Sequence, residues 1–147
     1  MKKIILTLFL LIFIIPNSVF AFEPPDPNRW FWAGSDDKIG VWIDMRTLKY
    51  HKEYNRYSPC KGHRFVTSWE LWYDARENIS TTNNCEYDLD CRKMRYLSSY
   101  TYNDSGDIIN STTIPGYYSK AVPGSWGEII MDYMDLFWNV SHNKNLN

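Results

Sequence analysis

The sequence predicts an α+β domain in which an antiparallel β-sheet meander carries a C-terminal α-helix packed on one face. Three observations support this fold class. Apolar residues alternate over residues 64–74, turn signals separate further β-rich runs, and a capping signal precedes a helical period over residues 126–140. An amphipathic helix needs an apolar surface to cover, and the apolar face of the sheet is the simplest one available.

An export signal is expected over residues 1–21. Lys2 and Lys3 precede an apolar run at residues 4–15, and Ala21 stands where a signal peptidase would cut. The run is short for a membrane span, and no later segment has about 18 uninterrupted apolar residues. We therefore expect an exported protein, periplasmic or at the cell surface or extracellular, with no transmembrane anchor after signal cleavage.

The mature length and charge favour one small domain. Removing the signal from 147 residues leaves about 126, enough for one core. We expect a proline-rich entry segment at residues 22–28, a single domain at 29–141 and a polar tail at 142–147. Two of the 16 basic residues lie in the signal and none of the 17 acidic ones, so the mature formal charge is −3. This balance argues against a nucleic-acid partner.

The first part of the chain contains three segments with β character. Residues 29–33 and 39–44 are expected to form a hairpin around a Gly-Ser-Asp-Asp turn. Residues 50–62 show no sustained period and are expected to form an irregular connection. The clearest strand covers residues 64–74. Its two faces carry Phe65, Thr67, Trp69, Leu71 and Tyr73 on one side and Arg64, Val66, Ser68, Glu70 and Trp72 on the other.

The second part of the chain continues the meander and ends in the helix. Residues 75–90 are expected to form a polar loop, followed by strands at 92–102 and 108–114 with Gly106 at positive φ between them. Ser125 and Glu128 form a Ser-x-x-Glu capping box before the helix. The expected apolar stripe of the helix consists of Ile129, Ile130, Tyr133, Met134 and Phe137.

Three cysteines allow one internal disulfide in an exported chain. Placing Cys85 and Cys91 in one loop, with Cys60 at the opposite end of the preceding strand, favours a disulfide between Cys85 and Cys91. Cys60 would then be buried, capped or available for a bridge to a second chain, which leaves a homodimer as an alternative. The spacing of the cysteines and histidines matches no zinc site, so no metal is expected.

Several short motifs occur in a characteristic order along the mature chain. They are Trp42-Ile43-Asp44 with Thr47-Leu48, Ser68-Trp69-Glu70-Leu71, Tyr87-Asp88, Asp90-Cys91-Arg92, Arg95, Tyr100-x-Tyr102, Gly106 and Val122-Pro123-Gly124-Ser125. In this order the chain resembles the bacterial surface-adhesin protein E-like domain family. The resemblance implies an antiparallel sheet with a C-terminal helix laid on it. It also implies a protein of the cell envelope or surface, some members of the family binding host extracellular proteins.

Two departures from the family concern cysteines. The family tends to place a cysteine in the C-terminal helix that ties it to the strand beginning Asp-Cys-Arg, whereas residues 126–140 contain none. Cys91 therefore lacks its family partner, and Cys85 or Cys60 could take that place. Lipid-anchored members also carry a leader cysteine that this chain lacks.

The chain shows no constellation typical of an enzyme. Its three histidines lie in no recognisable motif, and the alternating Glu86, Asp88 and Asp90 are more simply explained as a solvated segment than as a glycosidase carboxylate pair. We therefore expect a non-enzymatic binding protein with no cofactor.

Recognition residues are commonly found on loops, which makes the long connection the expected binding segment. The candidate residues there are Tyr50, Tyr54, Tyr57 and Lys61, for a host extracellular or envelope protein. The alternative is a periplasmic module that binds glycan or inhibits an enzyme, with Trp30, Trp32 or Trp72 stacking on the ligand. A flat aromatic patch would favour a protein partner, and a groove would favour a glycan.

Overall fold

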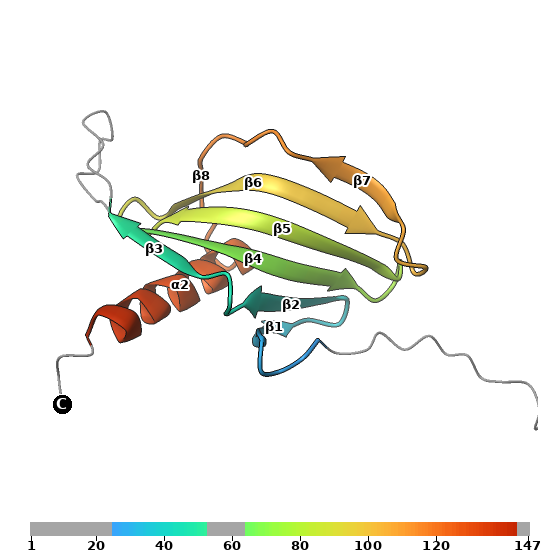
Figure 1. Cartoon of the computed structure of the whole chain (residues 1–147), viewed down its shortest axis with the longest axis horizontal. Helices are drawn as coiled ribbons and strands as arrows, with labels where there is room; N and C mark the ends of the chain where they lie inside the picture. Colours follow the sequence, from blue (N-terminus) through green and yellow to red (C-terminus); the bar gives the residue numbers. More distant parts are fainter. Residues whose placement is uncertain (1–24, 53–63, 144–147) are drawn as a thin grey trace, which may run out of the picture.

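A computed structural model describes residues 25–52 and 64–143 of the chain. These residues form an eight-stranded antiparallel sheet with the order β1-β2-β4-β5-β6-β7, in which β3 also pairs with β4 and β8 with β6 (Figure 1). Helix α2 lies across one face of the sheet. The predicted fold class, an antiparallel meander with a C-terminal helix packed on one face, is confirmed.

The elements follow the predicted boundaries closely, with additions at β3, β5 and β8. The strands are β1 (Trp30–Ser35), β2 (Ile39–Asp44), β3 (Lys49–Lys52), β4 (Arg64–Asp74), β5 (Ile79–Asp88), β6 (Lys93–Tyr102), β7 (Ile108–Thr112) and β8 (Ser119–Lys120), and the helix is α2 (Trp126–His142). The predicted positive φ at Gly106 is confirmed at 83°.

The expectation that residues 75–90 form a loop is wrong, because most of them belong to β5. This strand pairs with β4 on one side along its whole length and with β6 on the other side from Ser80 onward. Its sequence includes Asn83, Asn84 and Asp88, residue types that are depleted in strands, and shows little hydrophobic alternation, so the usual period-two signal is weak. Residues 49–52 similarly form β3 at the start of the expected connection, whereas residues 53–62 lie outside the described chain.

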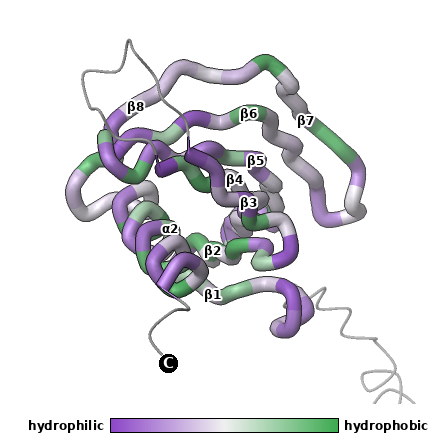
Figure 2. Tube along the Cα trace, turned by 60° about the vertical axis from the view of Figure 1, so that its left-hand side comes forward, coloured by the Kyte–Doolittle hydropathy of each residue, from purple (hydrophilic) through white to green (hydrophobic). Residues whose placement is uncertain are grey.

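The core lies between α2 and the facing side of the sheet. The helix buries Ile130, Met131, Met134 and Trp138 against a sheet surface formed by Ala33, Val41, Ile43, Val66, Cys85, Tyr87 and Met94. In Figure 2 the helix runs beside β1 and β2, whereas β7 lies away from it at the far edge of the sheet.

The predicted apolar stripe of the helix is partly wrong. Ile130 and Met134 are fully buried as expected, but Ile129 is 39% exposed and Met131 is fully buried instead. Tyr133 and Phe137 lie at the side of the contact, where each forms a T-shaped pair with Phe31 at ring-centroid distances of 5.0 and 5.3 Å. The helix is therefore rotated so that the row from Ile130 through Met134 to Trp138 faces the sheet.

The capping box forms with a small displacement. The backbone N–H of Glu128 donates to Ser125 Oγ at 3.4 Å, while the Glu128 carboxylate accepts from the backbone N–H of Gly124 at 2.8 Å. The reciprocal bond therefore reaches one residue further back than in the usual box. Gly124 allows this geometry because its φ is +76°.

Ion pairs tie the helix to the turn between β5 and β6 and to the start of β4. Arg92 contacts Asp132 at 2.7 Å, and Arg64 contacts Asp135 and Asp90 at 2.8 Å each.

Within the described part of the chain, no helix combines the length and apolar character needed to cross a bilayer.

The expected disulfide between Cys85 and Cys91 is a further correction, because Cys85 is a free thiol. Cys85 lies within β5 and points into the core, opposite Ser68 on β4 and Tyr96 on β6. Cys91 follows the end of that strand. The three residues of β5 that follow Cys85 extend about 10 Å toward Cys91, and this exceeds the distance between Cα atoms that a disulfide can span.

Candidate interaction surface

The side of the sheet opposite α2, hereafter the outer face, is rich in aromatic side chains. Residues paired directly across antiparallel strands share a face, and successive residues alternate. The pairs Trp32 with Trp42, Trp42 with Leu71, and Trp69 with Asn84 therefore define this face. By the same register it carries Trp32, Trp42, Thr67, Trp69, Leu71, Tyr73, Asn84, Glu86, Arg95, Tyr100 and Tyr102.

A glycine in β2 shapes one end of the outer face. A Cβ at Gly40 would lie 2.7 Å from Cη2 of Trp42, so the Trp42 indole occupies the space that a side chain would need. Trp32 meets this indole edge-on, with ring centroids 4.6 Å apart. Trp42 is buried, whereas Trp32 remains 48% exposed. The result is a supported tryptophan ring that is open to solvent.

The centre of the outer face contains a hollow of about 330 Å³ beside Trp69. Its lining consists of Arg46, Thr47, Lys49, Thr67, Trp69, Asn84 and Leu97. The Trp69 ring stacks on Tyr100 at a centroid distance of 6.1 Å. Arg46 and Lys49 are exposed, and neither forms a salt bridge with any other residue in 25–52 or 64–143. The hollow therefore combines an aromatic wall with two cationic groups that remain available to a ligand, and we call it the Trp69 hollow.

Glu86 organises a second cluster on the outer face. It accepts from Arg95 at 2.6 and 2.8 Å and from the Tyr118 hydroxyl, and the Arg95 guanidinium lies 4.6 Å from the Tyr118 ring centroid. Burial, with the Glu86 carboxylate adding to it, raises the pKa of Tyr118. His51 Nε2 lies 3.9 Å from the same carboxylate. Glu86 is thus fully engaged by its neighbours and offers little free negative charge.

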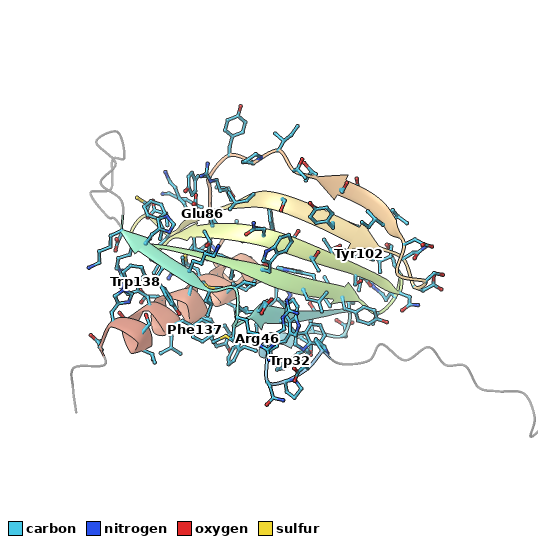
Figure 3. The ribbon with its side chains drawn as sticks, in the orientation of Figure 1. Trp32, Arg46, Glu86, Tyr102, Phe137 and Trp138 are labelled. Carbon is cyan, nitrogen blue, oxygen red and sulfur yellow. The ribbon has the colours of Figure 1, made fainter. Side chains whose placement is uncertain are left out.

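Figure 3 shows how these groups are distributed over the sheet. Trp32 and Arg46 lie on its β1–β2 side, and Glu86 and Tyr102 lie on β5 and β6. Phe137 and Trp138 belong to the helix on the opposite face.

The predicted binding residues are divided by the structure. Tyr50 lies on β3 and faces the helix, where its ring meets Trp138 at 5.8 Å and His142 at 5.6 Å. Burial raises its pKa despite a hydrogen bond with Ser141. Tyr50 is therefore in a packing position. Tyr54, Tyr57 and Lys61 lie outside the described residues.

The three tryptophans of the glycan alternative are divided between the two faces of the sheet. Trp32 lies exposed on the outer face, whereas the Trp72 indole N–H donates to the buried Glu70 at 2.7 Å on the helix side. The guanidinium of Arg29 lies 5.2 Å from the Trp30 ring centroid. These three residues do not form one stacking surface.

Sequence reasoning missed the Trp69 hollow because its parts come from separate segments. The alternation in β4 placed Trp69 on one of two faces, but it did not identify which face the helix covers. Arg46 lies in the turn between β2 and β3, and the sequence predicted no strand at β3. A predicted pairing of residues 49–52 with 64–67 would have brought these groups together.

Comparison of the chain with known protein families, curated proteins and solved structures finds no match. The resemblance to the surface-adhesin protein E-like domains therefore stays a prediction based on motif order.

Proposed function

We propose that this chain is an exported, non-enzymatic binding protein of the bacterial envelope, adhesin-like in its mode of action. Its outer face would engage a protein partner, either a host extracellular protein or another envelope protein. The observation that carries this proposal is the pair of exposed cationic groups, Arg46 and Lys49, beside the aromatic wall of the Trp69 hollow, because an acidic protein surface complements them better than a neutral sugar does. Tryptophan, tyrosine and arginine are the residues most enriched at energetic centres of protein interfaces.

The charge of the hollow suggests the character of the partner. Arg46 and Lys49 provide local positive charge on a chain whose mature formal charge is −3. An acidic loop or patch on the partner would complement these groups, while its apolar side chains would cover Trp69. Such complementarity raises the rate of association, and salt screens it.

The first experiment tests binding to immobilised serum and extracellular-matrix proteins by biolayer interferometry. Trp69→Ala should lower affinity for a bound partner about tenfold or more, as expected for a central aromatic anchor. Arg46→Glu combined with Lys49→Glu should slow association and reduce its salt dependence. Tyr117→Ala is the control, since that fully exposed side chain makes no ring contact with the hollow. Unchanged binding in both hollow variants would refute this surface as the interface.

The cellular location of the protein tests the proposed adhesin-like function independently of the binding experiment. Intact cells of the source organism are treated with protease, and the mature chain is detected with an antibody. Loss of the chain supports a position on the outer surface. Resistance of the chain to the protease, together with its recovery in a periplasmic fraction, would contradict an adhesin-like function and favour a partner inside the envelope.

A glycan is the second candidate ligand, because the Trp69 hollow is concave and also contains Thr67 and Asn84. Aromatic faces and neutral hydrogen-bonding groups together suit a sugar ring. A glycan array probed with wild type and Trp69→Ala distinguishes the two. Saccharide binding that Trp69→Ala abolishes, with no protein bound at the same site, would replace the protein partner with a glycan.

A further inference from the structure

A second hollow lies on the helix side of the sheet, beside the N-terminal end of α2. It has a volume of about 340 Å³ and is lined by Ile39, Trp72, Asp74, Glu77, Ile79, Thr81, Asn83 and Tyr96. Trp126, the first residue of α2, packs 6.4 Å from Trp72 at its side. Tyr96 is 43% exposed although it lies on the same face as the core. We call this site the Trp72 pocket.

A buried carboxyl lies behind the lining of the Trp72 pocket. Glu70 has no exposed surface, and its Oε2 accepts from the Trp72 indole N–H at 2.7 Å. Its direct partner across the strands is Asn83, which also lines the pocket. Glu70 also interacts with the Cys85 thiol, and apart from that weak donor its Oε1 has no hydrogen-bond partner among the described residues. A buried carboxylate oxygen served only by a thiol is costly, so a stronger donor placed beside it would be favourable.

The charged residues that line the pocket are both acidic. Asp74 and Glu77 belong to the lining, Glu70 lies behind it, and no lysine or arginine is part of it. Arg76 approaches Asp74 at 4.0 Å, but its side chain is 62% exposed. The two aromatic walls, Trp72 and Tyr96, offer ring faces that attract cations. Charge and ring chemistry therefore select the same class of ligand.

We propose that the Trp72 pocket binds a small organic cation, a protonated amine attached to a flat apolar group. The ammonium group would lie near Asp74 and Glu77, on the side of the pocket behind which Glu70 is buried, with the apolar group between Trp72 and Tyr96. The volume is at the lower end of the range for small-molecule sites and suits a ligand with a single ring. This site is on the opposite side of the sheet from the Trp69 hollow, so it does not depend on the proposed protein partner.

The test uses benzylamine and its neutral analogue benzyl alcohol with the ¹⁵N-labelled mature chain at about pH 8, because burial raises the pKa of Glu70 to about 7 and the group is mostly ionised above it. Benzylamine should shift the Trp72 indole N–H resonance in a saturable manner. The affinity for benzyl alcohol should be lower by about tenfold or more, because this probe lacks the positive charge that Glu70, Asp74 and Glu77 attract. Equal affinities for the two probes, or shifts that avoid the Trp72 and Tyr96 resonances, would overturn the proposal.

Three variants locate the interaction. Glu70→Gln should weaken benzylamine about tenfold and leave benzyl alcohol unchanged. Thr81→Trp, which fills the pocket, should abolish binding of both probes. Asp104→Asn, in the exposed turn before β7, removes a carboxylate elsewhere and should change neither.

Glu77→Gln keeps the test decisive if Glu70→Gln does not fold. Glu77 is exposed at the pocket mouth, so its loss should weaken benzylamine by about two- to threefold, and more at low salt. Benzylamine affinity that is unchanged in Glu77→Gln and in Thr81→Trp would refute binding at this site.

Discussion

The side-chain hydroxyl of Thr47 accepts a hydrogen bond from the backbone N–H of Trp69 at 3.0 Å. β2 pairs with β4 from Glu70 onward, and β3 pairs with it up to Thr67, so the Trp69 N–H falls at the junction between two partners. The hydroxyl also donates to the Asp44 carbonyl at 3.0 Å. Thr47 thus closes a gap in the ladder of the longest strand and at the same time lines the Trp69 hollow.

Thr47→Val should destabilise the domain, because valine leaves the Trp69 N–H without an acceptor. We expect the free energy of unfolding to fall by about 1–2 kcal/mol. Urea denaturation followed by circular dichroism measures the change. Thr47→Ser keeps the hydroxyl and should retain most of the stability. A Thr47→Val protein as stable as wild type would show that the junction needs no side-chain acceptor.

Glu70 should make stability depend on pH. Burial raises its pKa from 4.5 to about 7, although the hydrogen bonds from Trp72 and Cys85 oppose the shift. Below about pH 4.5 the group is protonated in both states, and between about pH 4.5 and 7 it ionises in the unfolded chain alone. Stability is therefore lost as pH rises through this window, by about 3 kcal/mol in total for this group.

Glu70→Gln removes this titration, and thermal melts from about pH 5 to pH 8 measure the result. The variant should gain stability relative to wild type as pH rises and differ little from it at the acid end. Glu77→Gln, an exposed carboxylate near the same strands, should follow the wild-type profile. A constant difference between Glu70→Gln and wild type across the range would contradict a raised pKa.

Gly40→Ala should disturb the aromatic packing of the outer face. The added Cβ would lie 2.7 Å from the Trp42 ring, and we expect a loss of about 1–3 kcal/mol in unfolding free energy. Gly116→Ala is the matched control, because the nearest atom to its Cβ lies at an ordinary 3.7 Å. In a Trp42→Val background the cost of Gly40→Ala should largely vanish. Equal effects of the two glycine substitutions would refute the steric explanation.

The Cys85 thiol should resist alkylation in the folded protein. It is fully buried, and burial with the neighbouring Glu70 raises its pKa well above the usual value. Iodoacetamide labelling followed by mass spectrometry of the Cys85 peptide should show slow modification, at a rate set by the small unfolded population. The same peptide should react at once in guanidinium chloride. Rapid labelling under native conditions would contradict a buried position in β5.

The sequence alone sufficed for most of the fold where two signals agreed. Alternation in β4 identified a strand, and the Ser125 cap with the apolar period identified α2. The sequence did not predict β5, because the backbone of that strand forms its hydrogen bonds with both β4 and β6 and the strand needs few apolar side chains. The buried Glu70 on the core face of β4 also obscured which face of that strand is internal.

The candidate site was predicted less well than the fold. Tyr50 was chosen as a residue of a loop, but β3 places it against Trp138. The Trp69 hollow depends on the lateral position of the turn between β2 and β3, which strand register alone determines. A pattern along one segment carries no information about such pairing between segments. The Cys85 and Cys91 pairing failed for a different reason, because residues 79–88 form β5 and not the expected loop.

The strand order has a kinetic consequence. Along the path β4-β5-β6-β7 each strand pairs with the next one in the chain, so these contacts form by closing short loops. The helix closes the core from the other end of the sequence, through contacts with Phe31 and Tyr50 about a hundred residues away. We therefore expect the hairpins to form early and the docking of the helix on the sheet to be the slow, rate-limiting step. The contact between Tyr50 and Trp138 would report on the progress of this docking.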